Sequence, residues 1–78
     1  MAIYIEITKV SETTQFVDYA FNEISREPGR IRISRETGTM ELIENQANYS
    51  EFVWRRAMRR LNLHWERGEF PEKTCWAS

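Results

Sequence analysis

The sequence is poor in several residue types, and each scarcity removes a class of protein. Its 78 residues include one Cys, two Pro and three Gly. A single Cys cannot form an internal disulfide, so the chain is unlike a disulfide-framed secreted domain and fits the reducing cytoplasm. The few Gly and Pro residues, together with 41% hydrophobic and 13% aromatic residues, are typical of a folded globular chain rather than a disordered one.

Long apolar runs are also missing. No stretch approaches the ~18 apolar residues that a membrane-spanning helix requires. The segment "MAIYIEITKV" (1–10) lacks the basic start and apolar run of a signal peptide, so we expect none. The expected location is the cytoplasm, with no contact with a membrane.

The side chains that usually carry catalysis are scarce. His64 and Cys75 are the sole representatives of their types, and they cannot close a zinc site without further ligands. His64 lies on the apolar side of a predicted helix, which favours a core or rim position, and Cys75 has no evident base beside it. We therefore expect a protein without enzymatic activity, with no catalytic residues, no metal and no cofactor.

The first part of the chain alternates between apolar and polar residues, as half-buried strands do. Ile3, Ile5 and Ile7 share one side of the first such segment. Gly38 lies between the last two segments and can adopt the positive φ that a tight turn requires. The pattern predicts antiparallel strands paired as two hairpins, over residues 2–9, 15–22, 30–35 and 39–44.

A helix is predicted over 49–67, where the period changes. Asn48 is a candidate N-cap, with Glu51 completing a capping box. Gly68 fits the C′ position, and Pro71 follows shortly after. Residues 68–78 are expected to form an irregular aromatic tail. The predicted fold is therefore a single α+β domain over 1–78, a four-stranded antiparallel sheet with one C-terminal helix on the Ile3/Ile5/Ile7 face.

Charge is unevenly distributed along the chain although its net value is only −1. Residues 1–29 carry a net −3, whereas residues 49–67 carry +3 from five Arg against two Glu. The small total gives no general attraction to polyanions or membranes. The basic helix and the acidic first hairpin are nevertheless complementary to each other.

The predicted helix has an apolar side and a basic side. Its apolar side holds Tyr49, Val53, Trp54, Ala57, Met58, Leu61, His64 and Trp65. Its basic side holds Arg55, Arg56, Arg59, Arg60 and Arg67. Phe52 and Leu63 are the exceptions, because they are apolar residues that fall on the basic side.

Two interpretations of the basic side remain open. The arginines can be a solvated face whose stems cover apolar neighbours, with the tail folding back over Phe52 and Leu63. Alternatively, they can bind carboxylates or phosphates. Two apolar side chains that flank Arg56, Arg59 and Arg60 resemble an interface, where Arg and aromatic residues are enriched. The candidate partner-binding set is Phe52, Arg55, Arg56, Arg59, Arg60 and Leu63.

The second face of the sheet has no predicted cover. It would display Tyr4, Glu6, Thr8, Phe16, Asp18, Arg32, Ser34, Glu41 and Ile43. Its mixed charges suggest cross-strand pairs. This face is expected to be solvated or covered by a second copy in a homodimer.

The sequence as a whole favours a small interaction module of unknown role. We expect it to bind a protein partner, or a second copy of itself, through the Arg-rich helix face and the aromatic tail. The alternative is a nucleic-acid-binding protein that places Arg55, Arg56, Arg59 and Arg60 on phosphates. That alternative is weaker because a pI near 5.8 is unlike the basic balance of most such domains.

Overall fold

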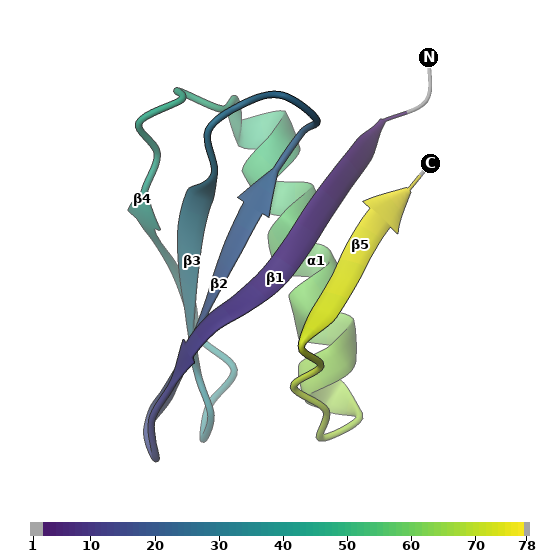
Figure 1. Ribbon diagram of the computed structural model, residues 1–78. Coiled ribbons are helices and arrows are strands. Elements are labelled where there is room, and N and C mark those ends of the chain that lie inside the picture. Colours follow the sequence, from purple (N-terminus) through teal and green to yellow (C-terminus); the bar gives the residue numbers. More distant parts are fainter. Residues whose placement is uncertain (1–2, 78) are drawn as a thin grey trace.

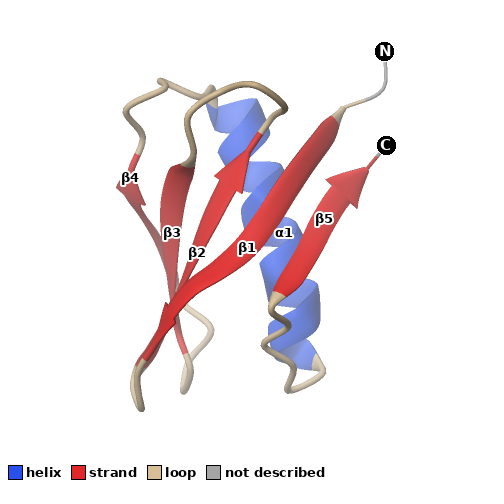
Figure 2. Cartoon of the chain, viewed as in Figure 1, coloured by secondary structure: helices blue, strands red, loops and turns tan. Residues whose placement is uncertain are grey.

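The computed structural model describes residues 3–77, which form one sheet and one helix (Figures 1 and 2). In chain order the elements are β1 (Tyr4–Glu12), β2 (Phe16–Asn22), β3 (Gly29–Ser34), β4 (Met40–Glu44), α1 (Glu51–Glu66) and β5 (Lys73–Ala77). All neighbouring strands are antiparallel, in the order β4-β3-β2-β1-β5. The predicted α+β class is confirmed, but within the described residues the sheet has five strands rather than four.

The core lies between α1 and the face of the sheet that carries the alternating apolar residues. Ile5 and Ile7 of β1 are at most 1% exposed, and Ile3 packs against the same cluster. The helix therefore covers the predicted face. The buried residues of the core are Ile5, Ile7, Val17, Tyr19, Phe21, Ile31, Ile33, Tyr49, Val53, Ala57 and Leu61.

The prediction of an irregular tail is wrong for residues 73–77, which form β5. This strand pairs with β1 along the edge opposite β4, with Trp76 opposite Ile5 and Thr74 opposite Ile7. Trp76 thus lies on the helix side of the sheet. The strand escaped prediction because its partner is some 70 positions away in sequence and no hairpin turn marks the pairing.

Strand β1 runs further than the predicted 2–9, whose residue 2 lies outside the described residues. The register with β2 shifts between Lys9 and Ser11, so a β-bulge at Val10 lets pairing continue through two more polar residues. The turn comes only at Thr13, whose hydroxyl accepts hydrogen bonds from the backbone N–H of Gln15 and Phe16.

The two ends of α1 differ in how well the sequence predicted them. At the N-terminus the predicted Asn48 cap is wrong: Asn48 has φ +55°, and the N-cap is Ser50, which makes no side-chain capping bond. Asn45 instead binds both the N–H and the C=O of Tyr49, which fixes the entry to the helix.

At the C-terminus the prediction is confirmed. Gly68 has φ +71°, and its N–H donates to Trp65 O at 2.9 Å while the Glu69 N–H donates to His64 O at 3.0 Å. This pair of bonds is the Schellman arrangement that glycine at C′ permits.

The predicted turn at Gly38 is confirmed, and it contacts the helix. Gly38 has φ +75°, and a Cβ placed on it would lie 2.8 Å from the Trp65 ring. The Trp65 indole also donates a 3.0 Å hydrogen bond from Nε1 to the carbonyl oxygen of Arg35. The β3–β4 loop is therefore attached to the last turns of α1.

Candidate functional site

The structure brings most of the predicted partner-binding residues together on the side of α1 that faces away from the sheet, whereas Arg60 lies at the junction with β5 and packs against Trp76. Phe52, Arg56, Arg59 and Leu63 recur at intervals of four, three and four residues, so they form one line along the helix. We call this line the arginine seam. Phe52 is 53% exposed and Leu63 is 38% exposed. The tail folds as β5 and leaves both apolar side chains in contact with solvent.

Two of the seam residues hold each other in place. The Arg56 guanidinium lies 3.4 Å from the centre of the Phe52 ring, and Arg56 Nη1 donates a 3.1 Å hydrogen bond to Phe52 O. Stacking on an aromatic ring leaves the edge of a guanidinium free to bind acceptors. Arg56 is thus preorganised with its charge available at the surface.

The arginines that flank the seam are engaged to different degrees. Arg55 forms an exposed ion pair with Glu51 at 2.7 Å, whereas Arg60 lies 5.6 Å from the centre of the Trp76 ring. Between residues 3 and 77, no carboxylate lies within ion-pair distance of Arg56, Arg59 or Arg60. The outer side of α1 therefore keeps an uncompensated positive charge.

The junction of α1 and β5 contains two buried donors without acceptors. Arg60 Nε and Trp76 Nε1 are both buried and make no hydrogen bond within the described part of the chain. Such a group costs roughly 1–3 kcal/mol when it is desolvated and left unpaired. At Arg60 and Trp76 the contact between helix and tail is consequently made by packing rather than by polar bonds.

An open hollow of about 700 Å³ adjoins the seam. Three arginines, Arg55, Arg56 and Arg59, line it together with apolar groups that include Met40, Met58 and Trp76. A surface of this composition suits a partner that offers acidic groups next to apolar ones.

The open face of the sheet satisfies its own charges to a greater extent. Asp18 is only 5% exposed, and Arg32 binds both of its carboxylate oxygens, at 2.9 and 3.0 Å. These hydrogen bonds lower the pKa of Asp18. Arg32 also lies opposite Glu41 in the register of β3 and β4, and its guanidinium is 5.2 Å from the centre of the Phe16 ring.

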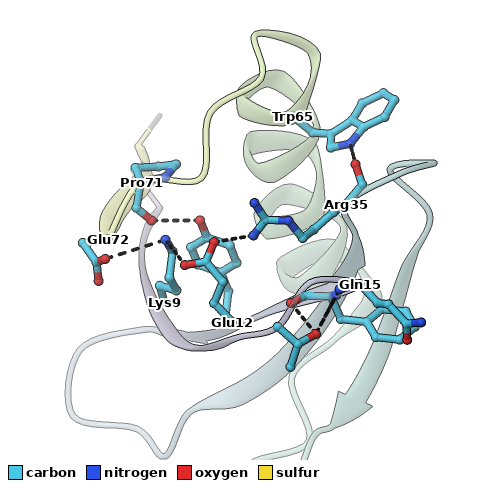
Figure 3. A network of polar contacts seen from close by, with 10 residues as sticks. Lys9, Glu12, Gln15, Arg35, Trp65, Pro71 and Glu72 are labelled. Carbon is cyan, nitrogen blue, oxygen red and sulfur yellow. Dashed lines mark hydrogen bonds and ion pairs between the residues drawn. The ribbon is translucent and has the colours of Figure 1, made fainter.

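Sequence reasoning missed a polar network at the end of the sheet below the C-terminus of α1 (Figure 3). Lys9, whose side chain is 11% exposed, lies between Glu12 at 3.1 Å and Glu72 at 3.6 Å, and Arg35 also pairs with Glu12. The alternation of β1 could have indicated it, since Lys9 continues the buried side of the strand after Ile7.

The same network includes a buried phenol. The Tyr19 hydroxyl donates a 2.8 Å hydrogen bond to Pro71 O, and burial, with a smaller effect of nearby Glu12 and Glu72, raises the pKa of Tyr19 to about 12. These contacts fasten the loop after α1 to the β1–β2 hairpin. They therefore position β5 and have a structural role.

The residues considered for catalysis are also accounted for. His64 sits at the rim of the core, with Nδ1 3.1 Å from Glu69 Oε1 and Nε2 2.8 Å from Thr74 Oγ1. Cys75 lies half-buried on the open face of the sheet and raises the pKa of Tyr4 through a side-chain hydrogen bond. Over residues 3–77, no three His, Cys, Asp or Glu side chains are grouped as a metal site, and no helix there has the length and apolarity to span a membrane.

Comparison of the chain with protein-family models, with curated proteins and with solved structures finds no match.

Proposed function

We propose that this protein is a small, non-enzymatic interaction module that binds a protein partner through the outer side of α1, with the Trp76 end of the tail beside it. The observation that carries the proposal is the arginine seam itself. Two exposed apolar residues, Phe52 and Leu63, enclose two arginines that have no ion-pair partner within the described chain. Interfaces are enriched in aromatic and Arg side chains, and Leu63 adds apolar area beside them.

Two further features support the proposal. Phe52 and Leu63 are exposed and do not belong to the core cluster. Packing of the core therefore does not explain why two large apolar side chains lie at the two ends of one line on the helix. Arg56 is held over the Phe52 ring, which reduces the side-chain entropy that binding would cost. The proposal includes a cytoplasmic location, which rests on the single cysteine.

The proposal is tested by affinity capture from an extract of the source cells at physiological salt. We expect the wild type to recover a specific protein, which the Arg56→Glu/Arg59→Glu variant does not recover. The matched control is Arg30→Glu/Lys73→Glu, which makes the same change of charge on the open face of the sheet. Equal loss in both variants would show that total charge rather than the seam is responsible.

Nucleic acid is the competing outcome of the same set of variants. Four arginines on phosphates would give a log–log salt dependence with a slope near −3 to −4 for duplex DNA. Fluorescence anisotropy over a salt series measures it. Tight binding with that slope, abolished by Arg56→Glu/Arg59→Glu, would replace the protein-partner proposal with a nucleic-acid one.

A further inference from the structure

The arginine seam has the spacing of a helix–helix contact. Intervals of four, three and four residues are those of successive d, a, d and a positions in a heptad repeat. In that register Phe52 and Arg59 occupy d positions, whereas Arg56 and Leu63 occupy a positions. Arg55 and Arg60 fall at the flanking g and e positions, which also determine the choice of partner in paired helices.

The seam is straight and short enough for one helix to cover it. The four residues extend over about 16 Å at ~1.5 Å per residue, all within the single helix α1. A helix that lies along this line would place its own a and d side chains against Phe52 and Leu63 at the ends and against the two arginines in the middle.

The charges of the seam oppose a symmetric pair in which the seams of two copies of the chain face each other. A symmetric pair brings the same patch of both copies together. In an antiparallel pair Arg56 would face Arg59 of the other copy, and in a parallel pair each arginine would face itself. Arg60 at e and Arg55 at g would add to this repulsion, because no carboxylate in the described chain pairs with Arg56, Arg59 or Arg60.

We infer that the partner presents a helix whose seam reads apolar-xxx-acidic-xx-acidic-xxx-apolar, and that it lies along α1 between Phe52 and Leu63. This inference rests on the proposed function and names the chemistry of its partner. The pattern is the same in both directions, so a parallel and an antiparallel helix would fit the seam equally. The acidic centre would supply the carboxylates that Arg56 and Arg59 lack, and the apolar ends would cover the two exposed side chains.

The test uses two designed 21-residue peptides, each held helical by a side-chain staple on its outer side because short free helices are marginal in water. Both have Leu at the ends of the seam. One carries Glu at the two central positions and Lys on the outer side, and the other exchanges these Glu and Lys residues, so that composition is identical. Binding to the purified full chain is measured by fluorescence anisotropy of labelled peptide.

We expect the wild type to bind the Glu-centred peptide at least about tenfold more tightly than the Lys-centred one. The central Glu residues would be attracted to Arg56 and Arg59, whereas central Lys residues would be repelled by them. The Arg56→Glu/Arg59→Glu variant should reverse this preference. An unfolded variant would bind neither peptide, so a reversal cannot result from unfolding. Arg59→Glu alone, at an exposed position, should reduce the preference in the same direction.

Equal affinity of the wild type for the two peptides would overturn the inference. A dimer of the free protein would also overturn it, if sedimentation equilibrium shows that Arg59→Glu dissociates that dimer. The two levels of the account fail separately. If the captured protein requires Arg56 and Arg59 but the Glu-centred peptide does not bind, the proposed function stands and the acidic helix is wrong. If capture does not depend on these arginines, the proposed function itself is wrong.

Discussion

Leu61 and Leu63 are chemically identical residues two positions apart, and their truncation separates the core side of α1 from its binding side. Leu61 is 2% exposed and belongs to the core cluster, whereas Leu63 is 38% exposed. The change to Ala removes three carbon atoms at each position. The same edit should therefore have different consequences for stability and for binding.

The expected magnitudes follow from burial. At Leu61 the lost transfer free energy is roughly 2–2.5 kcal/mol at about 0.8 kcal/mol per methylene group, and the cavity left in the core brings the total to about 2–5 kcal/mol. At Leu63 part of the side chain is already in water and no closed cavity forms, so the loss should be about 1 kcal/mol. A domain of this size unfolds with about 4–12 kcal/mol, so Leu61→Ala would remove a large share.

Urea unfolding followed by tryptophan fluorescence measures both losses, and thermal unfolding gives a second reading. For a domain of this length about 1 kcal/mol lowers Tm by roughly 4–8 °C, so Leu61→Ala should lower it several times further than Leu63→Ala. In the peptide assay the order reverses, because only Leu63 lies in the arginine seam. Equal loss of stability at both positions, or a larger loss at Leu63, would refute the orientation of α1 and the seam with it.

Further substitutions test the contacts around the helix. Trp65→Phe removes a hydrogen bond to a backbone carbonyl, whereas Trp76→Phe removes a buried donor that has no described acceptor; urea melts should show the larger destabilisation, by about 1–3 kcal/mol, at Trp65. Gly38→Ala should destabilise more than Gly68→Ala, because both adopt positive φ but only Gly38 would clash with the Trp65 ring; similar Tm losses would contradict this. Burial raises the pKa of Tyr19 from 10 to about 12, so its stabilising contribution is complete below pH 10 and is lost as the pH rises to 12. It amounts to roughly 2–3 kcal/mol, and Tyr19→Phe should show a correspondingly flatter fall in unfolding free energy over that interval.

The sequence predicted the parts of the fold that local pattern determines. Alternation identified four strands and their buried side, and Gly38 and Gly68 identified a turn and a helix end because only glycine adopts positive φ without strain. The parts that were missed depend on contacts distant in sequence. Strand β5 pairs with the other end of the chain, and the Asn48 cap failed because Asn45 binds Tyr49 instead.

In the candidate site, too, local pattern predicted one part, and contacts in the folded chain determine the rest. The helical wheel placed Phe52, the arginines and Leu63 on one side from sequence alone, because a period of 3.6 residues needs no tertiary information. Three-dimensional contacts then distinguished residues that the wheel treats alike. Arg56 stacks on Phe52, Arg60 packs against Trp76 and Arg55 pairs with Glu51, and none of these pairings could be chosen from composition or spacing.

The most direct test of the binding face is photo-crosslinking in the source cells with a photoreactive amino acid at one of two exposed positions. Glu66 continues the line of the arginine seam by three residues and leaves every arginine in place, whereas Glu41 lies on the open face of the sheet. The account predicts a crosslinked complex with a second, different protein from position 66 and not from position 41. A complex from position 41 alone, or from position 66 with a second copy of this chain, would contradict it.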